Sequence, residues 1–334
     1  MRLIISHISA LELCSRIAQS GRRVARPTKL RSLRECLSAE RNLPLFDLSQ
    51  LPKLQHRIDV LVPETTKRNI TKQLHCHSWG ASLPDGSFYS LGNNVYVTSP
   101  EFSLLLMSKS TTFNELIALC SEVCGCYQRD DSKRGFYDRP ALTSLARISS
   151  FLDRMGSASG TTKLARALRY AVENARSPME SALGILTNMP PRLGGYGLPK
   201  PELNHRIDFD EDEARIAGRA YVELDLFFKG ASQAPSVIIE YDSDQEHTGA
   251  DRIASDSRRN NTLRDIGFVV INLTWAQVRN SQALDAAMLQ VAHALDKPLR
   301  EPSASARAKR AQLRADVLPR IHDMVDAIDT RLVK

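Results

Sequence analysis

Short apolar runs separated by polar loops mark the elements of the first half of the chain. Residues 10–17 carry apolar side chains at helical spacing, whereas 58–63 and 94–98 are rich in β-branched residues and predict strands. Ser99 can cap a helix whose first turn holds Pro100, so an apolar helix should follow the second strand. This half therefore predicts an α/β domain.

Polar breaks and the length of the chain indicate how it divides. Residues 129–134 and 156–162 predict loops, and 164–175 predicts a helix that leads into the second half. One core rarely holds as many as 334 residues, and the end of the chain is rich in Ala and Arg, as in a basic helix. We therefore expect an N-terminal domain, a second domain and a basic helix over residues 1–170, 176–296 and 300–334.

The second half begins with a helix and continues with alternating segments. Ser177 can cap a helix that has Pro178 in its first position and Glu180 three residues after the cap. The acidic stretch 208–213 predicts a turn between the first two strands. The strands themselves are expected at 203–207, 220–228 and 236–241.

Carboxylates fall on shared faces of these strands. Side chains two residues apart in a strand lie on one face, so Glu223 and Asp225 point together, as do Glu240 and Asp242. The apolar run 237–239 indicates a central strand, with Glu240 near the end of its burial. Two carboxylates that end an apolar strand repel each other unless a cation or a donor is present, which favours a metal site.

A second helix and a final strand complete this half. A polar loop with His247 precedes a predicted helix over 251–266, which Gly267 ends before a strand at 268–273. The order helix, three meandering strands, helix, strand predicts an α/β fold with a mixed sheet flanked by helices. At about 100° per residue, one side of the second helix, which should face the sheet, carries Asp256, Arg259, Leu263 and Ile266.

The composition and net charge of the chain indicate what kind of partner it binds. Hydrophobic residues make up 42% and charged residues 25%, which excludes a disordered or fibrous chain. A net charge of +7 suits a polyanionic partner, nucleic acid first. The apolar start Leu3–Ile5 is too short for a signal peptide, and no run approaches the ~20 residues that cross a bilayer. A cytoplasmic protein without membrane association is expected.

The six cysteines fit neither a disulfide scaffold nor the paired spacing of a structural zinc site. Buried, reduced thiols are common in protein cores and are the favoured interpretation. A zinc-dependent interaction module is the alternative. Such a module would draw on Cys76, Cys120, Cys124, Cys126, His75 and His77.

The motifs of residues 177–278 resemble the DUF559 family, which is similar to the very-short-patch-repair endonucleases and belongs to the PD-(D/E)XK superfamily. They are, in order, Ser-Pro-x-Glu, a Glu-Leu-Asp strand, Ile-Glu-Tyr-Asp-x4-His and Asp-x2-Arg-x3-Leu-x3-Gly. The resemblance implies endonucleolytic hydrolysis of DNA that depends on Mg²⁺ (or Mn²⁺). Asp225 and Glu240 would bind the metal with Glu180 near them, and His247 would transfer a proton.

Phosphodiester hydrolysis explains these residue types, because a hard cation polarises the phosphoryl group and prefers oxygen ligands. Asp256 and Arg259 would give phosphate or structural support. Asp242 stands where the superfamily usually has lysine. The chain departs from the family pattern at Ser243, where the family often has glycine after the aspartate, and at Asn272, where it often has arginine. A non-catalytic DNA-binding or antitoxin-like regulatory protein with a degenerate nuclease fold is therefore the alternative function.

The first half has a shorter resemblance. The segments Val-Leu-Val-Pro, His-Cys-His and Val-Thr-Ser-Pro within residues 58–127 are similar to a region of abortive-infection-type antitoxins, where it often precedes a DUF559-like domain. The winged helix usual at the start of those regulators is not evident. The resemblance implies a substrate-positioning or protein-partner-binding role for this half.

Overall fold

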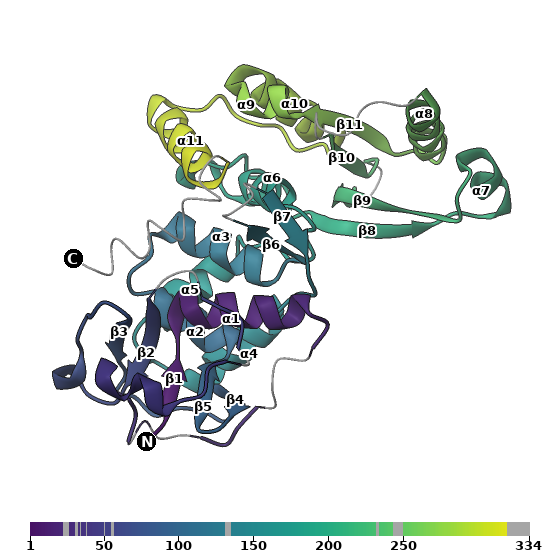
Figure 1. Ribbon diagram of the computed structural model, residues 1–334. Helices are drawn as coiled ribbons and strands as arrows, with labels where there is room; N and C mark the ends of the chain where they lie inside the picture. The colour runs from purple at the N-terminus through teal and green to yellow at the C-terminus, as the bar shows by residue number, and fades with distance from the viewer. Residues whose placement is uncertain are drawn as a thin grey trace. The chain divides into compact units, whose positions relative to one another are not determined.

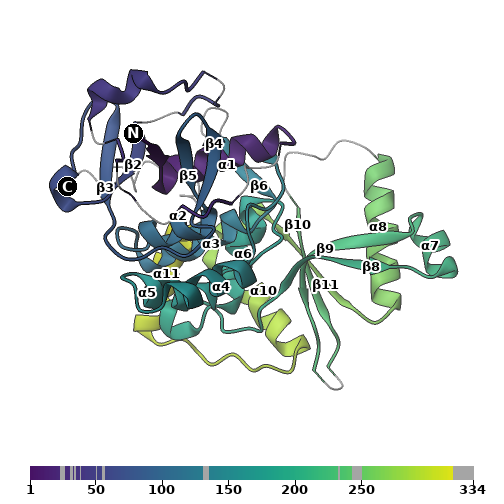
Figure 2. The same ribbon diagram turned by 90° about the horizontal axis from the view of Figure 1, so that it is seen from below.

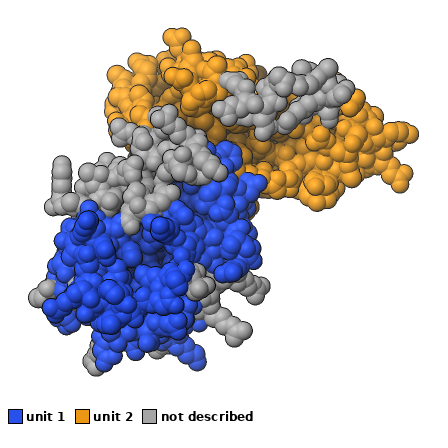
Figure 3. Space-filling view, viewed as in Figure 1, with its two compact units in different colours: residues 1–171, 320–334 blue, residues 172–319 orange. Residues whose placement is uncertain are grey.

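The computed structural model describes residues 1–22, 27–30, 33, 35–37, 39–49, 51–54, 57–130, 135–231, 234–242 and 250–318, with backbone alone at 66, 130 and 250–256. The chain forms two compact units (Figure 3). Unit 1 is built from residues 1–171 and unit 2 from residues 172–319.

Unit 1 contains a five-stranded mixed sheet with the strand order β3-β2-β1-β5-β4 (Figure 1). The short strand β1 pairs in parallel with β5 and antiparallel with β2, and β2 pairs in parallel with β3. The strands predicted from β-branched runs are confirmed as β2 and β5. The five strands are β1 (Leu3–Ile5), β2 (Ile58–Val62), β3 (Leu74–Ser78), β4 (Phe88–Gly92) and β5 (Val95–Thr98).

Helices and a hairpin complete unit 1. The predicted cap is confirmed, since the Ser99 hydroxyl accepts the Phe102 N–H at 3.2 Å and Pro100 is the first helical residue. Two predictions are wrong in part: a strand occupies the start of the expected loop 129–134, and the expected helix 164–175 ends at Leu168. The elements are α1 (His7–Gln19), η1 (Glu40–Leu45), η2 (Thr65–Lys67), α2 (Pro100–Met107), α3 (Phe113–Val123), β6 (Tyr127–Asp130), β7 (Gly135–Asp138), α4 (Leu145–Met155) and α5 (Thr161–Leu168).

Alternation along β2 and β3 separates an apolar face from a polar one. Val60, Val62, Leu74 and Cys76 pack in one aliphatic cluster together with side chains of α1. Because successive strand side chains point to opposite faces, the residues between them must lie on the other side of the sheet. That second face carries Asp59, Leu61, His75 and His77.

Unit 2 has a four-stranded sheet in the order β11-β10-β9-β8, with β10 and β11 parallel and the other pairs antiparallel (Figure 2). This confirms the predicted α/β class with a mixed sheet flanked by helices, and it confirms β10 as an internal strand. The elements are α6 (Pro178–Asn188), η3 (Pro191–Leu193), β8 (Glu202–Asp208), α7 (Glu211–Ala217), β9 (Tyr221–Phe228), β10 (Val237–Asp242), α8 (Ala250–Asp265), β11 (Val269–Thr274), α9 (Trp275–Arg279), α10 (Ser281–Ala294) and α11 (Ala304–Val317).

Two details of unit 2 differ from the sequence prediction. The acidic stretch expected as a turn contains helix α7, because Asp210 and Glu213 form a capping box at its start. Helix α7 lies at the end of the β8–β9 hairpin, beside α8 (Figure 2). On α8, Leu263 is fully buried against the sheet as expected, but Ile266 is 38% exposed because the helix ends at Asp265.

The basic C-terminal helix predicted over residues 300–334 is described as α11, and residues 319–334 of that prediction lie outside the described part of the chain. The cations of α11 bind protein groups. Arg310 forms an ion pair with Asp285 at 3.0 Å and lies over the Tyr196 ring, 4.1 Å from its centroid. Lys309 donates to the carbonyl of Arg192 at 3.0 Å. Among the described helices, none has the length and apolar character needed to cross a bilayer.

Candidate functional site

Three of the predicted acidic residues reach the candidate site from three different elements of unit 2. Glu180 lies in the first turn of α6, where the Ser177 hydroxyl accepts its backbone N–H at 3.2 Å. The expected reciprocal bond to the cap does not form. The carboxylate of Glu180 accepts instead from the Arg176 backbone N–H at 2.8 Å and from Asn204 Nδ2 at 2.6 Å.

Asp225 of β9 and Glu240 of β10 are held by groups outside their own strands. Asp225 Oδ2 accepts the backbone N–H of Tyr241 at 2.7 Å, across the antiparallel pairing of β9 with β10. Glu240 Oε2 lies 3.3 Å from Arg259 Nη2 of α8. Glu240 is 5% exposed, so its charge is balanced inside the protein by a guanidinium group.

Burial and mutual repulsion raise the pKa values of two of these carboxyl groups. Burial, followed by the charge of Asp225, raises the pKa of Glu180 to about 7. The pKa of Asp225 is raised by burial and by the charge of Asp242, against the opposing effects of the Tyr241 N–H and Arg259. A bound cation would offset this repulsion and stabilise the ionised carboxylates.

A pocket of about 550 Å³ adjoins these groups. Glu223 and Asp225 both line it, as their shared strand face predicts. Glu223 forms an ion pair with Arg176, in which the Nη2–Oε1 distance is 2.8 Å. Acidic, amide and cationic groups thus surround one cavity, lined by Arg176, Glu180, Asn204, Arg219, residues 220–223, Asp225 and Arg259.

The remaining predicted site residues stand apart from this pocket. Asp242, at the end of β10, is half-buried and does not line it. His247 lies outside the described residues, as does the side chain of Asp256, so their roles stay predictions. Arg259 was expected to tether Asp256 or hold a phosphate, and its described partners include Glu240 and Asn260.

The donors around the pocket fit a hard divalent cation, because they are carboxylate oxygens whose pKa values burial and repulsion have raised. They are not gathered as closely as the ligands of a formed site. Within the described part of the chain, the one group of three or more His, Cys, Asp or Glu residues whose ligand atoms all lie within 4.8 Å is in unit 1.

That group consists of Asp59, His75 and His77, all of them buried. His77 Nε2 lies 2.7 Å from Asp59 Oδ1, and His75 Nδ1 lies 3.3 Å from the same oxygen. A fourth buried side chain, His7, stacks on His77 with 3.6 Å between ring centroids. The sequence pattern singles out both β3 histidines, whereas the only local signal for Asp59 is that it is a lone aspartate inside an apolar strand.

The cysteines belong to the core, as the favoured interpretation expected. All six are free thiols, and five of them are buried. Cys76 faces the aliphatic cluster on the other side of β3 from its histidine neighbours. Burial raises the pKa of Cys14 to about 12 and that of Cys36 to about 11, so these thiols stay protonated. No cysteine joins a group of potential metal ligands in the described structure.

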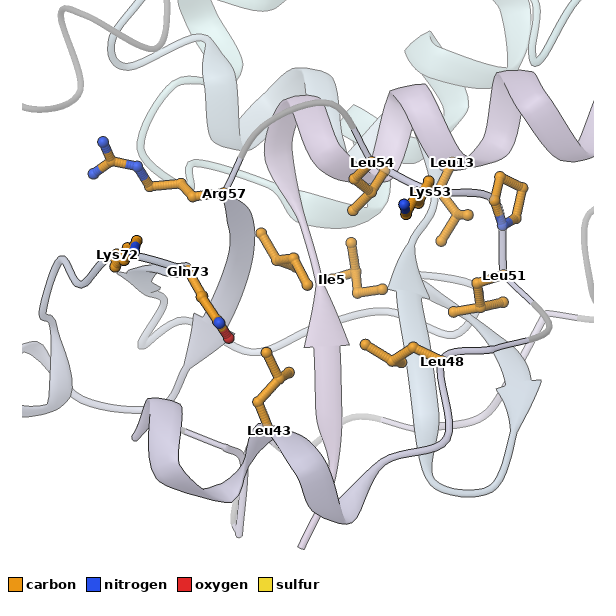
Figure 4. A pocket seen from close by; sticks show the side chains of 12 residues that line it. Ile5, Leu13, Leu43, Leu48, Leu51, Lys53, Leu54, Arg57, Lys72 and Gln73 are labelled. Atoms are coloured by element: carbon orange, nitrogen blue, oxygen red, sulfur yellow. The ribbon is translucent and has the colours of Figure 1, made fainter.

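A second pocket, of about 560 Å³, lies in unit 1 and is mainly apolar. Leu43, Leu48, Leu51 and Leu54 gather around Ile5 of the central strand (Figure 4). Among the described residues that line it, the charged side chains are those of Lys and Arg. These described lining residues offer no carboxylate or imidazole for acid–base or metal chemistry.

Comparison of the chain with protein-family models, curated proteins and solved structures finds no match. The family resemblances of residues 177–278 and 58–127 therefore stay predictions from the sequence.

Proposed function

We propose that unit 2 is a metal-dependent endonuclease that hydrolyses DNA phosphodiester bonds, with Asp225 and Glu240 as ligands of Mg²⁺ or Mn²⁺. The main support is one observation: carboxylates of α6 and β9 line one pocket together with Arg259, which pairs with Glu240 of β10, and the pKa values of Glu180 and Asp225 are raised. The motif resemblance of residues 177–278 and the net charge of +7 agree with this proposal.

Three residues around the pocket have roles in the proposed reaction. A bound cation supplies polarisation of the phosphoryl group and a lower pKa for the attacking water. Arg176 and Arg219 at the pocket are suited to bind phosphate oxygens. Glu180, with a pKa of about 7, can hold or release a proton near neutral pH. The predicted proton-transfer group His247 lies outside the described residues.

The test is cleavage of plasmid and single-stranded DNA with Mg²⁺ or Mn²⁺ by the wild type, Asp225→Asn and Glu240→Gln. Each substitution should lower the cleavage rate by at least about 100-fold, because it removes a charged ligand at nearly constant volume. Glu202→Gln is the matched control, since Glu202 is an exposed carboxylate of the same sheet and should leave the rate unchanged. Equal rates for all four proteins would reject this assignment of the site.

The second candidate is a non-catalytic DNA-binding regulator. The Arg259–Glu240 ion pair favours it, because the guanidinium already neutralises one proposed metal ligand. Such a protein should bind DNA equally with Mg²⁺ or EDTA, and the logarithm of its affinity should fall steeply with the logarithm of salt concentration. Metal-independent binding without cleavage would select this candidate over the nuclease.

A further inference from the structure

We propose that Asp59, His75 and His77 of unit 1 form a structural binding site for a divalent transition-metal ion, with Zn²⁺ as the expected occupant. This site is separate from the carboxylate pocket of unit 2 and does not depend on nuclease activity. The two strands that carry it, β2 and β3, pair in parallel with Asp59 opposite His75. The sheet register therefore brings the three side chains together on one face.

The ligand atoms are spaced almost as a metal requires. Zn–N and Zn–O bonds of about 2.0–2.1 Å in a tetrahedral site separate neighbouring ligand atoms by about 3.4 Å. The distance from His75 Nδ1 to Asp59 Oδ1 is 3.3 Å, close to this value. His77 Nε2 lies 2.7 Å from the same oxygen and would need only a shift of less than about 1 Å.

One ring nitrogen of the cluster is buried without a hydrogen bond. His75 is 3% exposed, and its Nδ1 has no hydrogen-bond partner despite its proximity to Asp59. An unsatisfied polar atom at such a buried position costs about 1–3 kcal/mol. Coordination to a metal would satisfy this nitrogen.

The carboxylate is held in place by a residue behind it. Ser9 of α1 donates to Asp59 Oδ2 at 2.9 Å and accepts the Asp59 backbone N–H at 2.9 Å. Oδ1 is thereby turned toward the two imidazoles. Outer hydrogen bonds of this kind orient metal ligands and strengthen their binding.

Charges near the cluster affect how tightly it can hold a metal ion. Two cations, Lys109 near His7 and Arg68 near His77, oppose a further positive charge and limit the affinity.

The donor set indicates the class of ion. Two imidazole nitrogens and one carboxylate oxygen suit Zn²⁺, Co²⁺, Fe²⁺ or Ni²⁺, whereas Mg²⁺ prefers oxygen ligands alone. Water would supply a fourth ligand. Since all three protein ligands are buried, the ion would act on stability and not on a substrate.

The experiment measures metal in untagged, full-length protein, both as purified from zinc-supplemented cells and after refolding with Co²⁺. We expect about one equivalent of Zn²⁺ per chain and, with Co²⁺, the visible absorption bands of a four- or five-coordinate ion. His75→Gln and His77→Gln should weaken the affinity by at least about 100-fold, and Ser9→Ala by about 10–100-fold. His293→Gln is the control, because His293 is an exposed histidine of α10 and should keep full binding.

A further control separates the two sites. Asp225→Asn/Glu240→Gln should keep the equivalent of Zn²⁺, because its substitutions lie in unit 2. Loss of the metal in this protein would assign it to the pocket of unit 2 and overturn the proposal. Absence of Zn²⁺ and Co²⁺ from the wild type after both treatments would overturn it as well, leaving Asp59 and the histidines as a hydrogen-bonded core cluster. Unchanged binding in both histidine variants would have the same consequence.

Discussion

Replacing Glu180 by glutamine should stabilise unit 2 above neutral pH and leave its stability unchanged in acid. Glu180 is 7% exposed, and burial together with the charge of Asp225 raises its pKa from 4.5 to about 7. Glutamine has nearly the same shape. Its side-chain oxygen can still accept from the Arg176 N–H and Asn204, which both donate to a single carboxylate oxygen.

The sign and size of the effect follow from proton linkage. An acid with a higher pKa in the folded state binds more protons when folded, so stability falls as pH rises between the unfolded and folded pKa values. For Glu180 this window runs from 4.5 to about 7. At 1.36 kcal/mol per pH unit, the accumulated cost is about 3 kcal/mol above pH 7, and it vanishes below pH 4.5.

The assay is urea unfolding between pH 4.5 and 8.5, followed by tryptophan fluorescence. The chain has two tryptophans, one in each unit, so a Trp79→Phe background leaves Trp275 as a reporter of unit 2. The free-energy difference between Glu180→Gln and its parent should grow from near zero to about 3 kcal/mol across the window. The two proteins are compared at each pH, because the raised pKa of Asp225 also makes the free energy of unfolding of the parent fall as pH rises.

Glu223→Gln provides a control from the same pocket. Glu223 is a more exposed carboxylate whose pKa is lowered chiefly by its hydrogen bond from Arg176. Removing this charge should therefore lower stability above pH 4.5 and not raise it. A free-energy difference for Glu180→Gln that stays constant from pH 4.5 to 8.5 would refute the reasoning.

Two further predictions concern stability. Arg259→Met leaves the buried charge of Glu240 unbalanced and should lower the free energy of unfolding by about 3–5 kcal/mol at neutral pH. Adding Glu240→Gln should restore most of this loss. If urea unfolding showed that the effects of the two single variants simply add in the double variant, the pairing would be contradicted. Gly195→Ala should cost about 3 kcal/mol or more in thermal unfolding, because an added Cβ would lie 2.0 Å from the Met189 carbonyl oxygen. Gly80→Ala, which meets nothing within 4 Å, is its control, and an equal change in Tm would count against this account.

The sequence predicted the elements of unit 2 because their signals are local. The Ser177 cap, the alternation of β9 and the apolar run of β10 each depend on residues within a few positions of one another. The misread turn at 208–213 also had a local signal, since Asp210 and Glu213 have the spacing of a capping box. The acidity of the stretch alone predicts a turn, whereas this spacing predicts the start of a helix.

Partners that depend on how separate elements pair could not be predicted in the same way. Tyr241 donates to Asp225 only because β9 and β10 adopt one particular antiparallel register. Arg259 meets Glu240 because α8 packs against the sheet, although helical spacing alone pairs Arg259 with Asp256. Local periodicity can place a charged side chain on a face, but it does not say which charge lies opposite.

The cluster in unit 1 shows the same division more sharply. Period-two alternation is enough to place His75 and His77 on one side of β3 and Cys76 on the other, which already separates the histidines from a cysteine-based site. Asp59 is 16 residues before His75 and meets it only through the parallel pairing of β2 with β3. A lone aspartate in an apolar strand needs a partner, because a buried charge without one is too costly to keep. That cost marks Asp59 as a residue with a specific neighbour, whereas only the register of the two strands identifies the neighbours as the histidines.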